Sequence, residues 1–417
     1  MRSWRTASSS EGYRGLRIAC AFVCTLVWRA AAADDIEFHG FADLRGVAAS
    51  DDATWTRGGL AKTRYGGNDG LHFGGAALRA TWQAAAPLLL VADLRYEPQD
   101  RTRAGLIEAY ARYRPVSIDA WRWSLKLGEF FPPISLENEG VGWTSLWTLT
   151  PSAINTWVGE ELRVFGAELR VEHRGDFSTL EAAGALFTAN DPAGEILFAR
   201  GWAFTDLVEG VGNRLREPDV YAYLVGTEPP RRYDPFVEID HRLGFYGDVT
   251  WRTQSGSRAT VLYYDNRADP SRYHVFDGHD ELFAWRTHFT SVAAQTRFGD
   301  LVLMGQGMAG TTEIAPSGFR GEAHFSAAYA LAGWELGAWR PALRLDIFDT
   351  REDPAAPPAL SEHGNALTFA LNWRPCDWLR LTGEALRVES TRDQRLALGL
   401  APREVDRQIQ FNARFLF

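Results

Sequence analysis

Five glutamates lie in a stretch of the chain that holds no basic residue, between Lys126 and Arg163. They are Glu129, Glu137, Glu139, Glu160 and Glu161. Carboxylates gathered at the narrow point of a path repel anions and favour cations, because rings of charge set ion selectivity there. The chemistry that this stretch offers is therefore electrostatic, and it requires a scaffold that holds the glutamates around a solute path.

Catalysis and metal binding are the other kinds of chemistry that clustered histidines and acids could perform. The densest group of histidines and acids is His274, Asp277, His279 and Asp280, whose spacing matches no zinc motif. We expect it to be a polar surface loop, and we predict neither a metal nor a cofactor. The sequence has no Gly-rich phosphate loop, H-E-x-x-H or G-x-S-x-G motif. We therefore do not expect this protein to be an enzyme. If it is one, the alternative is a hydrolase of the outer membrane.

The first 33 residues have the three parts of a secretory signal peptide. Its basic region contains Arg2, Arg5, Arg14 and Arg17. Residues 18–28 form an apolar run, and Ala30–Ala33 offer the small residues that a signal peptidase needs. The run has 11 residues, whereas a membrane-spanning helix needs about 20. We predict cleavage after Ala33 and export of residues 34–417.

Charge and cysteine content narrow the class further. The sequence of 417 residues carries 44 basic and 53 acidic residues, and loss of the leader removes five arginines and Glu11. The resulting net charge of −13 argues against a nucleic-acid partner, which usually meets a basic surface. Cys20 and Cys24 fall in the leader, so Cys376 is left without a partner for an intramolecular disulfide.

Apolar and polar residues alternate with a period of two through most of the chain after residue 34, which indicates strands. The strands run about 9–13 residues, enough to cross a bilayer at a tilt, whereas soluble strands average about 5–6. Charged residues of both signs occupy the polar face, as a water-filled lumen requires. The predicted pore-wall residues are Arg45, Asp93, Arg95, Glu108, Arg112, Arg122 and Lys126.

Sixteen such segments can be placed. They are 36–48, 71–83, 88–97, 104–114, 121–131, 160–173, 177–189, 236–253, 258–266, 281–298, 301–311, 321–334, 339–349, 363–374, 378–390 and 403–417. Short connections alternate with long ones at 49–70, 132–159, 190–235, 267–280, 350–362 and 391–402, a pattern typical of bacterial barrels. A further hairpin in 190–235 would raise the count to eighteen.

The end of the chain resembles the C-terminal strand of bacterial outer-membrane barrels. Ile409, Phe411, Ala413, Phe415 and Phe417 alternate with polar residues. The resemblance implies that Phe411, Phe415 and Phe417 form the signal recognised by the barrel-assembly machinery. Together with the strand pattern, it predicts an all-β fold: one transmembrane antiparallel β-barrel over residues 34–417, in the outer membrane of a Gram-negative bacterium, with lipids as neighbours.

A barrel of sixteen strands is wide enough to leave an aqueous channel. We therefore predict an outer-membrane porin that passes small hydrophilic solutes or ions by passive diffusion. The alternative is a closed or plugged barrel with a structural or adhesion role. Part of 190–235 is apolar enough to pack, as indicated by Trp202, Phe204, Leu207 and Val208. In the plugged-barrel alternative, this part of the connection folds back into the lumen.

Three segments resemble the phosphate-selective porin O and P family. They are LGEFFPPISLEN at 127–138, WRPALRLDIFD at 339–349 and ALTFALNWRPCDWLRLTGE at 366–384. The resemblance implies a homotrimer of barrels whose third loop folds inward and narrows the pore. It also implies selection of phosphate by a ladder of arginines and a cluster of lysines, but this chain has only Lys62 and Lys126.

That departure, with the acidic stretch, favours mild cation preference or weak selectivity over phosphate specificity. Our hypothesis for the constriction is that Glu137 and Glu139 approach its narrowest point. Wall arginines would face them and create a transverse field that favours small polar solutes. The opposing residues in this hypothesis are Arg45, Arg95, Arg112 and Arg122.

Overall fold

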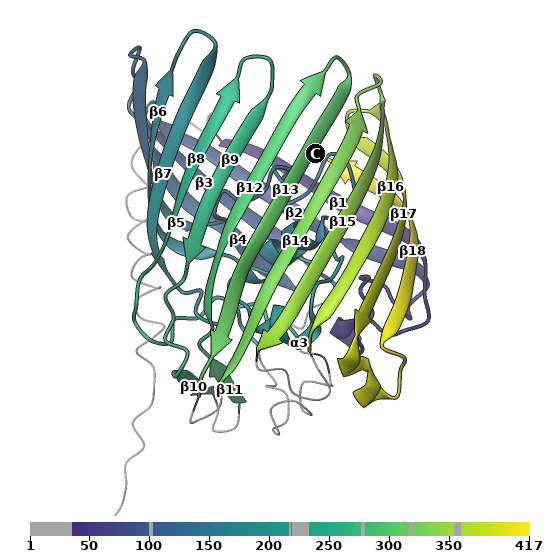
Figure 1. The fold of residues 1–417 in the computed structure, drawn as a ribbon. Helices are drawn as coiled ribbons and strands as arrows, with labels where there is room; N and C mark the ends of the chain where they lie inside the picture. The colour runs from purple at the N-terminus through teal and green to yellow at the C-terminus, as the bar shows by residue number, and fades with distance from the viewer. Residues whose placement is uncertain are drawn as a thin grey trace, which may run out of the picture.

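The computed structural model describes residues 36–99, 103–216, 218, 233–276, 280–316, 320–353 and 360–417. Its main feature is a closed antiparallel barrel of sixteen strands (Figure 1). The first strand, β1 (Ile36–Ala49), pairs with β2 (Gly70–Ala85) on one side and with the last strand, β18 (Arg403–Leu416), on the other. The predicted fold class and strand count are confirmed, whereas the predicted leader lies outside the described residues.

The remaining barrel strands follow one another around the wall. They are β3 (Leu88–Tyr96), β4 (Ala104–Tyr113), β5 (Trp121–Phe130), β6 (Val164–Arg174), β7 (Ser178–Thr188), β8 (Gly244–Thr253), β9 (Arg258–Asp265), β12 (Arg286–Phe298), β13 (Leu301–Ile314), β14 (Gly321–Trp334), β15 (Trp339–Asp353), β16 (Glu362–Cys376) and β17 (Leu379–Arg392). β7 pairs directly with β8, so the alternative of eighteen strands is wrong.

Three predicted strands begin later in the structure because other elements or connections occupy their first residues. The strand expected from residue 160 begins at Val164, because helix α2 (Ala153–Glu161) occupies the preceding residues. Ser152 starts that helix by accepting a hydrogen bond from the backbone N–H of Asn155. The strand expected from 236 begins at Gly244. The segment expected at 281–298 divides into β12 and β11 (Asp280–Phe283), which pairs with β10 (Tyr273–Phe276) outside the barrel.

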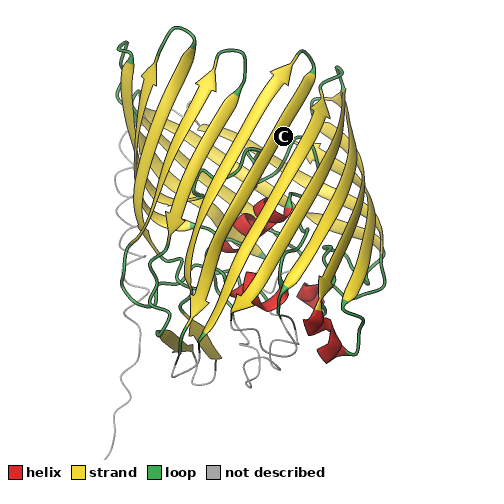
Figure 2. Cartoon of the chain, viewed as in Figure 1, coloured by secondary structure: helices red, strands yellow, loops and turns green. Residues whose placement is uncertain are grey.

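The two ends of the barrel are different. Short turns join the strands at one end, and the long connections gather at the other (Figure 2). The long-loop end holds the short 3-10 helices η3 (Trp55–Arg57) and η4 (Asp393–Leu398), while α2 lies within the barrel. The predicted alternation of short and long connections is therefore confirmed.

The outer face of the wall is apolar. In β15, Leu343, Leu345 and Ile347 are exposed, whereas Arg344 and Asp346 between them are buried. Side chains alternate across a strand, so the exposed apolar set faces outward and the charged set faces the lumen. An apolar outer band is what contact with lipid demands. Within the described residues, no helix combines the length and apolar composition needed to cross a bilayer.

The hydrophobic core lies inside the barrel. Trp157 of α2 packs edge-to-face on Phe325 of β14 and on Phe289 of β12, with ring centroids 5.1 and 5.6 Å apart. Trp202 and Phe204, from the connection between β7 and β8, are completely buried in the same cluster. The segment predicted to pack, which includes Leu207 and Val208, is therefore buried as expected.

The barrel closes where the two ends of the described chain meet. The backbone N–H of Gly40 donates to the carbonyl oxygen of Phe417 at 2.9 Å, and the N–H of Phe417 donates back at 3.1 Å. Phe411 and Phe415 are exposed on the outer face of β18. Their role with Phe417 in assembly stays a prediction.

Substitution of Gly40 tests how much the fold depends on this closure. A Cβ atom on Gly40 would lie 2.3 Å from the ring of Phe417 and 2.6 Å from the carbonyl oxygen of Ala77. We expect Gly40→Val to lower the folded fraction, read as the heat-modifiable band in a gel. The control is Gly383→Val, because a Cβ on Gly383 meets nothing within 4 Å. Equal folded fractions in the two variants would contradict this expectation.

Candidate functional site: the narrowed lumen

The connection between β5 and β6, residues 131–163, enters the lumen and is fastened there by Glu137. The Glu137 carboxylate accepts hydrogen bonds from the backbone N–H of Ser152 at 2.7 Å and from the side-chain amide of Asn155 at 2.9 Å. It lies 3.4 Å from Nη1 of Arg344 on β15. Glu137 is buried, so it holds the inward loop to the wall rather than standing as a free charge.

Arg344 is the wall residue that receives this loop. Its guanidinium donates to the carbonyl oxygens of Thr150 and Pro151, each at 2.8 Å, and pairs with Asp346 at 2.8 Å. Arg344 was not among the predicted site residues. Its alternation with Leu343 and Leu345 predicts an inward side chain, but nothing local to it identifies the partner loop.

Two further glutamates of the acidic stretch also have basic neighbours. Oε1 of Glu139 lies 2.5 Å from Nη1 of Arg258 on β9. Oε1 of Glu129, at the end of β5, lies 3.9 Å from Nε of Arg163. Burial lowers the pKa of Arg163 to about 10, although the charge of Glu129 opposes that change.

Glu160 and Glu161 end helix α2 and tie it to a second inward segment, residues 190–210 of the connection between β7 and β8. Glu160 forms an ion pair with Arg200 of helix α3 (Glu195–Arg200) and accepts a hydrogen bond from the Thr205 hydroxyl at 2.5 Å. Burial raises the pKa of Glu160 to about 7, and Arg200 opposes the rise. Glu161 accepts hydrogen bonds from the backbone N–H groups of Ile196 and Leu197, at 3.0 and 3.2 Å. The two inward segments therefore form one unit.

Three arginines contact Asp206 of the second inward segment, two from wall strands and Arg64 from the connection between β1 and β2. Asp206 accepts hydrogen bonds from Arg45 of β1 at 3.0 and 2.6 Å and from Arg64 at 2.8 Å. Arg95 of β3 donates to the Asp206 backbone carbonyl at 3.0 Å. Burial alone would raise the pKa of Asp206, but the charges of Arg45 and Arg64 hold it far below its usual range. Asp206 and Arg64 were not among the predicted site residues.

The structure does not bring the predicted opposing charges together. Arg45 and Arg95 meet Asp206, whereas Glu137 and Glu139 meet Arg344 and Arg258. The remaining predicted wall residues have separate partners or positions. Asp93 pairs with Arg79, and Lys126 lies near Glu168. Glu108 accepts a hydrogen bond from the backbone N–H of Phe131, and Arg122 donates one to the carbonyl oxygen of Asp119. Arg112 lines a cavity.

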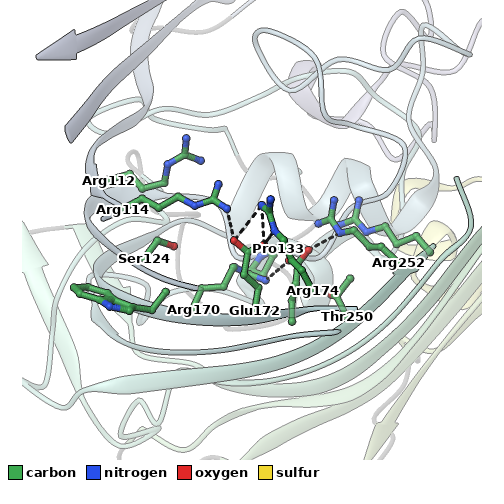
Figure 3. Close-up of a pocket in the computed structure, with 12 residues that line it drawn as sticks. Arg112, Arg114, Ser124, Pro133, Arg170, Glu172, Arg174, Thr250 and Arg252 are labelled. Carbon is green, nitrogen blue, oxygen red and sulfur yellow. Dashed lines mark hydrogen bonds and ion pairs between the residues drawn. The ribbon is translucent and has the colours of Figure 1, made fainter. Parts of the chain in front are cut away.

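Arginines line two cavities at the end of the barrel that carries the short turns. The first, of about 380 Å³, is shown in Figure 3, where Arg114 and Arg174 both point to Glu172. Its arginines are Arg112, Arg114, Arg170, Arg174, Arg252 and Arg258, and its acids are Glu172 and Glu181. The second, of about 1040 Å³, has four arginines and one acid, which are Arg340, Arg374, Arg380, Arg414 and Asp377. This end of the lumen is therefore basic, although the chain as a whole is acidic.

The metal-ligand patterns give no additional site. Two carboxylate groups gather in the described part of the chain, Asp52 with Glu404 and Asp406, and Asp191 with Glu238 and Asp240. Arg395 already pairs with Asp52 and Glu404, and backbone N–H groups donate to Asp191. In the histidine cluster considered above, Asp277 and His279 lie outside the described residues.

No family model and no curated protein matches the sequence. Solved structures do match. One is a loop-deletion mutant of OmpT, an outer membrane protein of Vibrio cholerae, at 9% identity and a TM-score of 0.50, covering 92% of this chain and 99% of that one. Another is the OmpF complex with daunomycin from Salmonella typhi, at 11% identity and a TM-score of 0.50, covering 92% and 97%.

The fold is that of an outer-membrane β-barrel. Identities this low show the fold alone, and the fold agrees with the closed wall and its apolar outer band. The predicted location in the outer membrane is confirmed.

Removal of Arg344 tests whether paired charges hold the inward loop. Arg344→Met leaves Glu137 and Asp346 buried without their cation, which costs about 3–5 kcal/mol in comparable pairs. The control is Arg403→Met, because Arg403 is 69% exposed and surface pairs contribute about 1 kcal/mol or less. The free energy of unfolding in detergent measures both variants. Losses of equal size would contradict the role given to Arg344.

Proposed function

We propose that this protein is a porin-type channel, through which small hydrophilic solutes cross the outer membrane by passive diffusion. The observation that carries the proposal is a polar lumen narrowed from within. The strands turn charged side chains such as Asp43, Arg45 and Arg344 inward, and residues 131–163 and 190–210 fold between them. The predicted constriction by Glu129, Glu137, Glu139, Glu160 and Glu161 is part of this proposal.

The paired state of these glutamates bears on ion selectivity. Cation preference would need carboxylates free to meet passing ions, but Glu137, Glu139 and Glu160 each lie beside an arginine. Ten arginines and three acids line the two cavities at the short-turn end, and two of these arginines, Arg112 and Arg380, form no ion pair with a described carboxylate. Charge at a narrow aqueous path acts on ions through low-dielectric walls. We therefore infer weak anion preference in place of the cation preference that the sequence favours.

The closed barrel with a structural role is the second candidate. Its supporting observation is the aromatic cluster of Trp157, Trp202, Phe289 and Phe325, which joins the inward segments to β12 and β14. An apolar cluster across part of the lumen excludes water from that part. The cluster therefore favours a low conductance, and a cluster that closed the whole lumen would allow no conductance.

Membership of the phosphate-selective porin O and P family, with its homotrimer, belongs to the proposal as well. It rests on the resemblance of segments 127–138, 339–349 and 366–384, and an inward third connection is what that resemblance implies. Cross-linking of the purified barrel in detergent, read as the mass of the largest species, tests the trimer.

Single-channel recording in planar bilayers tests the function. We expect small, stable conductance steps from the wild-type protein and larger ones from the double variant Trp157→Ala, Trp202→Ala, because both rings fill the lumen. The control is Trp334→Ala, since Trp334 is exposed at the barrel rim. Absence of steps from every form would support the closed barrel instead.

The same recordings in a salt gradient test selectivity. We expect a reversal potential of the sign that anion preference gives, and a shift towards zero in Arg114→Gln, Arg252→Gln, because both side chains line the smaller cavity. A reversal potential of the opposite sign would restore the cation preference predicted from the glutamates.

A further inference from the structure

The larger cavity contains an arginine whose charge is not balanced. Arg380 of β17 lies directly opposite Arg414 of β18 in the antiparallel ladder, and both side chains face inward. Asp43 accepts two hydrogen bonds from Arg414, each at 2.7 Å, and also pairs with Arg45 at 2.9 Å. Asp43 is thus shared by two other arginines.

Arg380 has no equivalent partner. In the described ranges of the chain, no carboxylate forms an ion pair with Arg380 within 4.0 Å. Its Nη1 donates to the carbonyl oxygen of Ser145 at a long 3.4 Å, and its buried Nε has no hydrogen-bond partner. Only 8% of the residue is exposed. Buried polar groups are nearly always hydrogen-bonded, so this group points to a missing acceptor.

The cross-strand arrangement strengthens this argument. Like charges directly opposite each other in a sheet destabilise it, and an unpaired buried charge adds a further penalty. The other arginines of the cavity have carboxylates of their own, since Arg340 lies 3.8 Å from Glu335 and Arg374 lies 3.4 Å from Asp377, so these acids do not compensate Arg380. An anion beside Arg380 would relieve both penalties.

An apolar surface adjoins the same arginine. Leu146, the residue after Ser145, is 49% exposed although it belongs to the inward loop. Val141, Trp378 and Leu416 line the cavity with it. The volume of about 1040 Å³ lies at the upper end of the range of small-molecule sites, roughly 300–1,000 Å³. The cavity therefore offers one cation and an apolar wall to the same occupant.

We propose that this cavity binds small organic carboxylates with an apolar or aromatic body. The carboxylate accepts hydrogen bonds from the Nη groups of Arg380, and the body lies against Leu146 and Trp378. Inorganic phosphate would satisfy the guanidinium but would gain nothing from the leucine. The proposal rests on the proposed channel, to which it adds a solute class, but binding itself can be measured without conductance.

Cys376 provides a reporter because it lines the same cavity. The experiment measures the rate at which a maleimide alkylates Cys376 in the detergent-solubilised barrel, by mass spectrometry of the peptide. The probes are benzoate, acetate and inorganic phosphate at equal ionic strength. We expect benzoate to slow the alkylation at concentrations at which acetate and phosphate do not.

Variants assign the effect to the two halves of the site. Arg380→Gln should raise the benzoate concentration for half-protection by about tenfold or more, as expected for loss of a charge-assisted hydrogen bond. Leu146→Ser should weaken benzoate but leave any acetate effect unchanged. Arg403→Gln, at an exposed residue of the opposite end, should behave as wild type.

Two outcomes would overturn the proposal. One is equal protection by phosphate and benzoate, which would make the site one for inorganic anions. The other is benzoate protection that survives Arg380→Gln. If that variant does not fold, Arg380→Lys, which keeps the charge but lacks the paired donors, should weaken benzoate binding several-fold. Protection without conductance would retain this site and reject the channel, and conductance without protection would do the reverse.

Discussion

Closure of the sheet is the constraint on which the rest of the structure depends. In lipid, every backbone N–H and C=O group must find its partner within the protein, so a sheet that crosses a membrane can leave no open edge. The ladder between β1 and β18, finished by the paired bonds of Gly40 and Phe417, removes that edge. Closure also fixes which side chains face the lumen, because alternation leaves each strand only two faces.

A closed wall of sixteen strands creates a second requirement. Its interior is wider than its own side chains can fill. Residues 131–163 and 190–210 enter that space, and buried ion pairs and an aromatic cluster hold them there. Pairs such as Glu137 with Arg344 fix position more than they add net stability, since desolvation offsets much of their attraction. The acidic stretch that suggested selectivity is thus explained first as a means of placing loops.

The sequence predicted the wall because the wall is a local pattern. Alternation with a period of two depends on neighbouring residues, and it located all sixteen strands. Boundaries were wrong where another local signal intervened, as at Ser152, which starts α2 shortly before the strand predicted from residue 160. The site could not be predicted in the same way, because its pairs are distant in sequence. Glu137 and Arg344 are 207 residues apart, and Arg45 and Asp206 are 161 apart.

The distribution of partners explains how an acidic chain can have a basic opening. Carboxylates such as Glu137, Glu160 and Asp206 lie where the inward loops are anchored, and each of these three pairs with an arginine there. Near the short turns the inward loop supplies Glu139 to Arg258, but no carboxylate in the described part of the chain forms an ion pair with Arg112 or Arg380. Net charge therefore says little about the field that a solute meets. What matters is which charges remain unpaired along the lumen once the inward loops are in place.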